Sequence, residues 1–354
     1  MKEKIMIGMS GGVDSSVAAL MLKNDGYEVA GVTMILKPAD ILTPEEALLL
    51  KKEAEDAKAV CDALGIPHYT PDFTEEFREK VIKNFSEEYF AGRTPNPCVR
   101  CNQNLKFGKM LDFALEMGYD KIATGHYSHI ERREDGRYLL KKADSRKDQS
   151  YFLYGFTQHQ LAHTLLPLNR LEKDEARALA AEYGLPVANK PDSQEICFIR
   201  NNDYVSFLET YCGGKSVPGD FVDLQGNVIG KHRGIYNYTI GQRKGLGVTF
   251  GEPRYVTAIN GVNNTVTLGP EGTQYRSTLI AGDLNFIPFD ELTEPIKVTA
   301  KVRYQAKPSP ATVTPLGDGR AEVVFEEAQR SVTPGQAVVF YDGDTVIGGG
   351  TILT

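Results

Sequence analysis

The chain has 354 residues, a formal net charge of −7 and five cysteines, and 41% of its residues are hydrophobic and 25% charged. This composition is typical of a globular protein of two or three domains, and the lack of any run of about 18 apolar residues excludes a transmembrane helix. The small, odd number of cysteines argues against a disulfide scaffold, and the negative charge argues against a generally basic nucleic-acid binder. Because the N-terminus enters a strand pattern without a signal or transit peptide, we expect a cytoplasmic protein.

The first two hundred residues alternate between strand and helix patterns. An apolar strand at residues 5–9 is followed by a glycine-rich turn and a helix at residues 17–23. Further strands are predicted at residues 28–36, 68–71 and 121–124, and further helices at residues 44–64, 74–91 and 102–117. The alternation predicts an α/β fold with a doubly wound parallel sheet, in which ligands lie at the carboxyl ends of the strands.

After about residue 205 the pattern changes to short strands separated by glycine and proline. Residues 223–227 look like a hairpin turn, residues 297–304 alternate apolar and polar side chains, and Asp342-Gly343 lies between two apolar runs. These features predict a small middle module and a C-terminal antiparallel β-barrel. We therefore expect an N-terminal α/β domain at residues 1–204, a middle module at residues 205–271 and a barrel at residues 272–354.

The turn after the first strand carries the sequence Ser10-Gly11-Gly12-Val13-Asp14-Ser15-Ser16. Its two glycines permit a tight backbone close to a ligand, and a helix N-terminus attracts phosphate groups. The P-loop pattern is absent, so the turn has no lysine for a γ-phosphate. The alternative interpretation is an ordinary strand-to-helix turn. The seven residues resemble the loop of the pyrophosphate-loop ATPases, which cut ATP between its α- and β-phosphates.

Two cysteine segments form a second group of candidate residues. Residues 94–102 read TPNPCVRCN, where Asn102 is predicted to cap a following helix, so that Cys101 precedes the helix N-terminus. That position, together with nearby basic residues, would favour the Cys101 thiolate. Cys197 lies in a loop that reads DSQEICFI at residues 192–199. Alternatively, the Cys-x-x-Cys pattern is a metal half-site, although no partner half-site follows it in the sequence.

Seven motifs follow one another along the chain: SGGVDSS at residues 10–16, TPNPCVRCN at 94–102, ATGHY at 123–127, KDQSYFL at 147–153, DSQEICFI at 192–199, TIGQRKGLG at 239–247 and TPGQAVVFY at 333–341. Together they resemble the MnmA/TrmU family of tRNA-specific 2-thiouridylases over nearly the whole chain. The resemblance implies an enzyme that replaces the 2-oxygen of the wobble uridine by sulfur. The oxygen is first adenylated with ATP and Mg²⁺, and the sulfur then comes from a persulfide supplied by a donor protein.

The resemblance also implies roles for individual residues. ATP contacts are implied for Gly8, Met9, Ser10, Gly11, Gly12, Val13, Asp14, Ser15, Met34 and Gly125. Cys101 matches the nucleophile of the family, and Cys197 matches the cysteine that carries the persulfide. Two thiols are needed because the transfer of one sulfur atom leaves an oxidised pair, which must be reduced before the next turnover.

A further set of residues is implied to contact the tRNA. The target base is expected beside Asn96, Pro97 and Cys98, and other parts of the tRNA at Lys147, Asp148, Gln149, Arg303, Tyr304 and Gln336. His126 follows a strand at the carboxyl edge of the sheet, so we expect it to contact the nucleotide or the tRNA. Lysines and arginines cluster near residues 141–147, 243–244 and 297–307, which favours phosphate contacts in an otherwise acidic chain.

One position departs from the family pattern. Many members have an acidic residue where this chain has Cys98, which puts proton transfer by a carboxylate at that position in question. One hypothesis is that Cys98, Cys101 and Cys197 hold an oxygen-sensitive iron–sulfur cluster with one open iron. The alternative is that Cys98 is an ordinary loop cysteine near the site. We expect no other resident metal.

Two other functions remain open at this point. Another pyrophosphate-loop ligase would adenylate a small carboxylate or carbonyl compound and would not need Cys101 and Cys197. An RNA-binding sulfur carrier would relay a persulfide without ATP and would not need Asp14. A small-molecule ligase should therefore keep its activity when either cysteine is replaced by serine. A sulfur carrier should keep its activity when Asp14 is replaced by asparagine.

Overall fold

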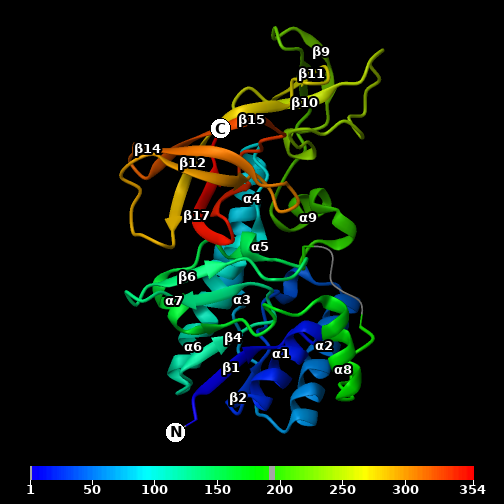
Figure 1. Cartoon of the computed structure of the whole chain (residues 1–354). Helices are drawn as coiled ribbons and strands as arrows, with labels where there is room; N and C mark the ends of the chain where they lie inside the picture. Colours follow the sequence, from blue (N-terminus) through cyan, green and yellow to red (C-terminus); the bar gives the residue numbers. More distant parts are fainter. Residues whose placement is uncertain (1, 191–195) are drawn as a thin grey trace. The chain divides into compact units, whose positions relative to one another are not determined.

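The computed structural model describes residues 2–190 and 196–354, and the chain divides into two compact units (Figure 1). Unit 1 comprises residues 1–81, 98–194 and 344–346, and unit 2 comprises residues 82–97, 195–343 and 347–354. Within the described residues, every helix is too short or too polar to cross a membrane.

Unit 1 is built on a five-stranded parallel sheet with the strand order β3-β2-β1-β4-β7. The strands are β1 (Lys4–Gly8), β2 (Glu28–Val32), β3 (His68–Tyr69), β4 (Lys121–Ala123) and β7 (Thr164–Leu165). The central strand β1 is apolar and buried on both faces, as expected where helices cover a parallel sheet. The predicted α/β fold with a parallel sheet is confirmed.

Three helices share a hydrophobic core with β1, and in Figure 1 they lie beside one another. They are α1 (Val13–Asn24), α2 (Pro44–Leu64) and α8 (Lys173–Glu182). The bounds of α2 are those predicted from the sequence, because strong signals mark both ends. A capping box joins Thr43 and Glu46 at its start, and Gly65 adopts the left-handed conformation at its end, with a φ of 62°.

Other helical elements of the first two hundred residues are shorter and include two π-helical stretches. They are η1 (Ala39–Ile41), α3 (Thr74–Phe77), η2 (Arg78–Ile82), α4 (Lys83–Phe90), α5 (Pro97–Cys101), η3 (Asn102–Lys109), α6 (Met110–Glu116), η4 (Ser150–Leu153) and α7 (Gln158–Ala162). The run α5-η3-α6 begins at Pro97, five residues before the predicted start. Proline is favoured in the first turn of a helix, so Pro97 and not Asn102 marks this helix start.

Unit 1 also contains a small hairpin that was not predicted from the sequence, formed by β5 (His129–Arg132) and β6 (Tyr138–Lys141). Its turn contains Asp135-Gly136, and Gly136 has a φ of 91°. Lys141 at the end of β6 pairs with Thr345, which brings a C-terminal residue into unit 1.

The predicted middle module is a four-stranded sheet within unit 2, with the strand order β10-β11-β8-β9. After η5 (Arg200–Asn202) and α9 (Tyr204–Tyr211), the elements are β8 (Gly219–Val222), β9 (Val228–His232), η6 (Ile235–Asn237), β10 (Tyr255–Asn260) and β11 (Thr265–Gly269). The predicted hairpin turn joins β8 and β9, where the Asp223 carboxylate accepts hydrogen bonds from the backbone N–H groups of Gln225 and Asn227.

The C-terminal part of unit 2 is the predicted antiparallel barrel, with the strand order β12-β15-β14-β13-β16-β17. Its strands are β12 (Tyr275–Phe286), β13 (Ile296–Lys301), β14 (Ser309–Gly317), β15 (Arg320–Arg330), β16 (Ala337–Asp342) and β17 (Thr345–Ile352). Pairing of β12 with β17 closes the barrel. The alternation predicted around β13 is confirmed, because Val298, Ala300 and Val302 are buried whereas Lys297 and Arg303 are exposed.

Candidate active site

The glycine-rich loop lies between the carboxyl end of β1 and the first turn of α1. Gly11 has a φ of 67°, and a Cβ atom there would lie 2.5 Å from the Glu53 carbonyl oxygen, so only glycine fits. Gly12 is the N-cap residue of α1, and no side chain caps this helix. N–H groups at an uncapped helix start are free to bind water or an anion, so the loop is suited to phosphate.

Hydroxyl groups hold the loop in shape. The Ser15 and Ser16 hydroxyls donate to the Gly12 carbonyl oxygen at 3.2 and 2.8 Å, and Ser10 Oγ lies 3.3 Å from Ser15 Oγ. Ser16 is fully buried, whereas Ser10 is exposed. Ser10 is therefore the loop hydroxyl that is open to a ligand, and Ser16 has a structural role.

A second segment, which follows β4, packs directly on the first turn of α1. A Cβ atom on Gly125 would lie 2.8 Å from both the Asp14 carbonyl carbon and the Ser15 backbone nitrogen. Two residues later, the buried Tyr127 donates its hydroxyl proton to Asp14 Oδ1 at 2.8 Å. The predicted ATP residues Asp14, Ser15 and Gly125 therefore form one contiguous group in unit 1.

The remaining predicted ATP residues lie around the same edge of the sheet. Gly8 is the last residue of β1, and Val13 begins α1. Met9 is buried, and its backbone N–H donates to the Val32 carbonyl at the end of β2. Met34 is half-buried two residues beyond β2. Because β1 and β2 are parallel, these positions follow the carboxyl ends of neighbouring strands.

His126 directly follows Gly125 and contacts the ring of Phe107. Its Nδ1 atom lies 2.8 Å from Thr124 Oγ1, and its ring centroid lies 5.6 Å from that of Phe107. Burial lowers the pKa of His126 well below its usual value, and the positive charge of Lys106 lowers it further. The imidazole is therefore neutral at neutral pH, so it can exchange hydrogen bonds with a ligand but carries no charge for a phosphate.

Cys98 and Cys101 both lie on α5, three residues apart, and therefore on neighbouring parts of its surface. Cys98 is exposed, and Cys101 is buried with 8% of its surface accessible. Although Cys98 is exposed as a whole residue, desolvation raises the pKa of its thiol, and the ammonium of Lys106 acts in the opposite direction.

The prediction that Cys101 precedes a helix N-terminus is wrong. Pro97 starts the helix, so Cys101 is the fifth helical residue and is followed without a break by η3. The first-turn field that lowers a thiol pKa falls off within about one turn, and Cys101 lies beyond it. Asn102 is not a cap either, because its side-chain Nδ2 donates to the Phe152 carbonyl oxygen at 3.1 Å.

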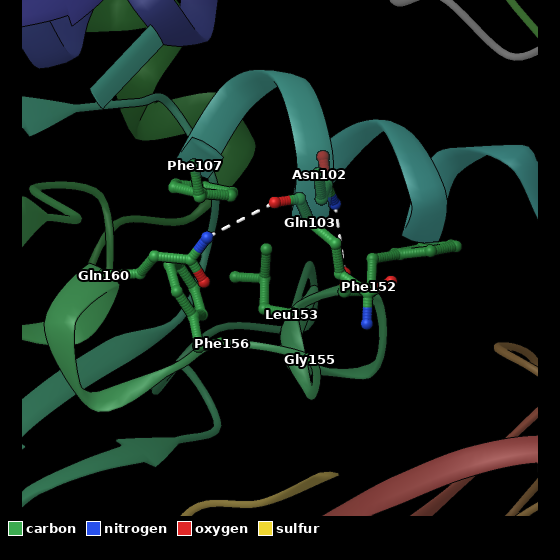
Figure 2. Close-up of a pocket in the computed structure, with 8 residues that line it drawn as sticks. All are labelled: Asn102, Gln103, Phe107, Phe152, Leu153, Gly155, Phe156 and Gln160. Atoms are coloured by element: carbon green, nitrogen blue, oxygen red, sulfur yellow. Dashed lines mark hydrogen bonds between the residues drawn. The ribbon is translucent and has the colours of Figure 1, made fainter. Parts of the chain in front are cut away.

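A small cavity adjoins the Cys101 segment in unit 1 (Figure 2). Its volume is about 10 Å³, roughly the space of one water molecule. Asn102 is buried, and its Oδ1 atom has no partner among the described residues. Figure 2 shows the Gln160 side chain reaching the Gln103 carbonyl, at 3.3 Å. Together with the bond to Phe152, this contact fixes the residues directly after Cys101.

Cys197 lies in unit 2, and its neighbour Phe198 anchors it. The Phe198 ring contacts those of Phe85 and Phe207, with centroids 5.2 and 5.3 Å away. Cys197 itself is exposed. The first four residues of the predicted DSQEICFI motif, 192–195, lie outside the described residues. The Cys197 thiol is therefore accessible from solvent, next to an aromatic residue that is held in place.

Cys101 is in unit 1 and Cys197 is in unit 2, so their approach to one another remains a prediction. The iron–sulfur hypothesis gains no support from the geometry. Among the described residues, no three His, Cys, Asp or Glu side chains are grouped so that they could hold a metal ion. A cluster on Cys98, Cys101 and Cys197 needs residues of both units, so it stays a hypothesis.

Gln336 holds the segment that leads to Cys98. Its Nε2 atom donates to the carbonyl oxygens of Thr94 and Pro95, at 2.9 and 3.0 Å. Next to it, Gly335 has a φ of 90°, and a Cβ atom there would lie 2.8 Å from the Thr94 carbonyl oxygen. All of these residues belong to unit 2, in which Gln336 fixes the backbone before Asn96 and Pro97.

The other predicted tRNA residues differ in their exposure and in the hydrogen bonds that they form within the protein. Lys147 and Arg303 are exposed, and Lys301 lies 5.5 Å from the Tyr304 ring centroid. By contrast, Asp148 accepts hydrogen bonds from Ser150 and the Ala143 backbone, and the Gln149 side chain accepts one from the Tyr127 N–H. Asp148 and Gln149 therefore also shape the loop that carries Lys147.

The fold and the loop together define the class of this protein. A parallel sheet with a glycine-rich loop between β1 and the N-terminus of α1 is the arrangement of a nucleotide-binding α/β domain. Residues 3–201 match a family model described as the tRNA methyl transferase HUP domain. Residues 205–270 match the tRNA methyl transferase PRC-barrel domain, and residues 276–352 match the aminomethyltransferase beta-barrel domain.

Curated relatives are similar to the chain over its whole length. It is 53% identical to the tRNA-specific 2-thiouridylase MnmA of Clostridioides difficile, over 99% of this chain and 98% of that protein. It is also 53% identical to the protein of the same name from Acetivibrio thermocellus, over 99% of each. The chain belongs to the tRNA-specific 2-thiouridylase MnmA family, as its motifs predicted. A solved NMN synthetase from Francisella tularensis matches 54% of this chain and 67% of its own, with 20% identity and a TM-score of 0.31, a similarity too weak to indicate a shared function.

Proposed function

We propose that this chain is an ATP-dependent tRNA 2-thiouridylase that acts on the wobble uridine. The observation that carries the proposal is the identity of about half of all residues, over the whole chain, with proteins of that name. The arrangement of the glycine-rich loop supports the use of ATP, because an uncapped helix start and a tight backbone suit a phosphate chain.

The first half of the proposed reaction activates the uracil. The 2-oxygen attacks the α-phosphorus of ATP while N3 loses its proton, and the bond to the bridging oxygen breaks. Pyrophosphate leaves with the bonding electrons. The loop from Ser10 to Ser15, with Gly8, Met9, Met34 and Gly125, would bind the nucleotide, and Mg²⁺ enters with ATP as part of the substrate. Adenylation is needed because the bare 2-oxygen is a poor leaving group, whereas AMP leaves readily.

The second half transfers sulfur. The terminal sulfur of a persulfide on Cys197 attacks C2 and displaces AMP, after which the Cys101 thiolate attacks the Cys197 sulfur and releases the 2-thiouridine. In the other order, Cys101 attacks the persulfide first, and the sulfide that it releases displaces AMP. Both orders leave a Cys101–Cys197 disulfide, which an external thiol must reduce. A donor protein supplies the persulfide sulfur.

Contacts with the tRNA complete the proposal. Asn96, Pro97 and Cys98 would surround the target base, and the exposed Lys147 and Arg303 would contact phosphate groups. The remaining proposed contacts are His126, Asp148, Gln149, Tyr304 and Gln336. A cytoplasmic location fits this role, because the substrate is a tRNA.

Pyrophosphate release tests the nucleotide half of the proposal. Purified protein with Mg-ATP should release pyrophosphate when unmodified tRNA with a wobble uridine is added, and the Asp14→Asn variant should release much less. Release that depends on a small carboxylate compound and not on tRNA would contradict the proposal in favour of a ligase. Sulfur transfer by the Asp14→Asn variant at the wild-type rate would favour a sulfur carrier.

A further inference from the structure

The one acidic side chain of the glycine-rich loop is held by three hydrogen bonds. Lys173 Nζ donates to Asp14 Oδ1 at 2.7 Å and to Oδ2 at 2.8 Å, and the Tyr127 hydroxyl donates to Oδ1 at 2.8 Å. Lys173 is 159 residues from Asp14 in the sequence, and both belong to unit 1. No sequence motif identified Lys173 as part of the site.

The fold places the Lys173 ammonium with little freedom. Lys173 is the first residue of α8, and a capping box between Glu172 and Glu175 fixes the start of that helix. Ala176 and Ala180 of α8 are fully buried in the core that α1 shares. Only 13% of the Lys173 side chain is exposed, so its ammonium stays at the first turn of α1.

The glycine-rich loop has no cationic side chain of its own to bind a phosphate chain. The loop itself offers backbone N–H groups and hydroxyls, which are neutral, and its only ionisable side chain is the Asp14 carboxylate, which repels phosphate. A phosphate oxygen and a carboxylate oxygen are equivalent partners for an ammonium. Mg²⁺ in turn prefers carboxylate and phosphate oxygens to other ligands.

We propose that Lys173 is a phosphate ligand of the bound nucleotide, and that it exchanges Asp14 for a phosphate oxygen when Mg-ATP binds. The inference rests on the proposed function, since it requires ATP at this loop. Without nucleotide, Lys173 neutralises Asp14. With Mg-ATP, the Asp14 carboxylate would be available as a ligand of the metal ion, and the Lys173 ammonium would bind the phosphate chain, where it would compensate the charge of the departing pyrophosphate. Lys173 thus supplies the cation that the loop sequence lacks.

Binding measurements with three probes test this assignment. Calorimetric titrations with Mg-ATP, Mg-pyrophosphate and adenosine are compared for wild type and for Lys173→Met. Because a charge-assisted contact is lost, the affinity for Mg-ATP and Mg-pyrophosphate should fall roughly 10- to 100-fold, and the affinity for adenosine should not change. Lys173→Arg should restore part of the affinity, because it keeps the charge.

Lys121→Met is the matched control. Lys121 forms a comparable ion pair in the same unit, 2.7 Å from Glu3, but lies at the first residue of β4 and thus at the opposite edge of the sheet. The Lys121→Met variant should bind Mg-ATP, Mg-pyrophosphate and adenosine with the affinities of wild type. If Lys173→Met binds Mg-ATP and Mg-pyrophosphate as Lys121→Met does, the inference is wrong.

A double variant separates a phosphate ligand from a partner that only holds Asp14. The double variant Asp14→Asn, Lys173→Met leaves no unpaired charge. It should therefore fold, and its binding can be measured, even if Lys173→Met alone does not fold. The inference predicts that it binds Mg-pyrophosphate roughly 10-fold or more weakly than Asp14→Asn alone. Equal affinities would contradict it. If wild type itself binds no Mg-ATP, both this inference and the proposed function are wrong.

Discussion

Replacing Gly125 with alanine tests the contact between the segment after β4 and the loop. The added Cβ atom would lie 2.8 Å from the Asp14 carbonyl carbon and the Ser15 nitrogen, closer than such atoms approach, and both neighbours are backbone. The first turn of α1 must therefore move away from β4. Overpacking of this kind costs about 1–3 kcal/mol. For a unit of this size, the loss corresponds to a decrease in melting temperature of about 2–12 °C.

The assay combines thermal unfolding with titration of Mg-ATP. Gly125→Ala should melt at a lower temperature and bind Mg-ATP at least roughly 10-fold more weakly, because the displaced turn carries the predicted phosphate contacts. Gly251→Ala is the control, since a Cβ atom there meets nothing within 4 Å. A Gly125→Ala protein with the melting temperature and Mg-ATP affinity of wild type would refute the proposed packing of this segment on the loop.

Three further predictions concern the segment before Cys98, the barrel surface and His126. Gln336→Ala removes two hydrogen bonds to backbone carbonyls, worth about 0.5–1.5 kcal/mol each, and should lower the rate of tRNA thiolation while Mg-ATP binding is kept. Changing Lys301 and Arg303 to glutamate should weaken tRNA binding and reduce its salt dependence, as measured by titration at several salt concentrations, with Mg-ATP affinity unchanged. Because the pKa of His126 is well below 6.5 in the folded state, the unfolded state binds its proton first as the pH falls. Unfolding measured against pH should show that wild type loses stability below about pH 6.5 more steeply than His126→Gln.

Each of these predictions has a specific contrary result. Gln329→Ala removes similar hydrogen bonds elsewhere on the barrel, so an equal loss of thiolation in both glutamine variants would contradict the role of Gln336. Unchanged tRNA affinity of the glutamate variant at every salt concentration would remove the barrel strand from the tRNA site. Parallel stability curves for wild type and His126→Gln between pH 7.5 and pH 5.5 would show that this imidazole is not held neutral by burial.

Local signals made parts of the fold predictable from the sequence. The bounds of α2 followed from Thr43, Glu46 and Gly65, each of which acts through neighbours a few residues away. The alternation around β13 identified the buried face of the barrel because a strand has a period of two residues. The glycine-rich loop was also predictable, because the strand, the turn and the helix start that form it are contiguous in the sequence.

Other parts depended on contacts that no local pattern contains. Asn102 looked like a cap, but its side chain bonds to Phe152, which is 50 residues away. Lys173 reaches Asp14 only because α8 packs beside α1. The hairpin β5–β6 was missed although Asp135-Gly136 is a turn signal, because each of its strands is only four residues long.

Mass spectrometry of nucleosides tests whether this chain thiolates tRNA through Cys101 and Cys197. Unmodified tRNA is incubated with Mg-ATP, a persulfide donor and either wild type, Cys101→Ser or Cys197→Ser. The proposed reaction predicts 2-thiouridine with wild type and none with either variant, because both thiols are needed for each transfer. A product that persists in one variant would move the sulfur chemistry to Cys98 or to free sulfide. If wild type forms no 2-thiouridine, the proposed function is wrong.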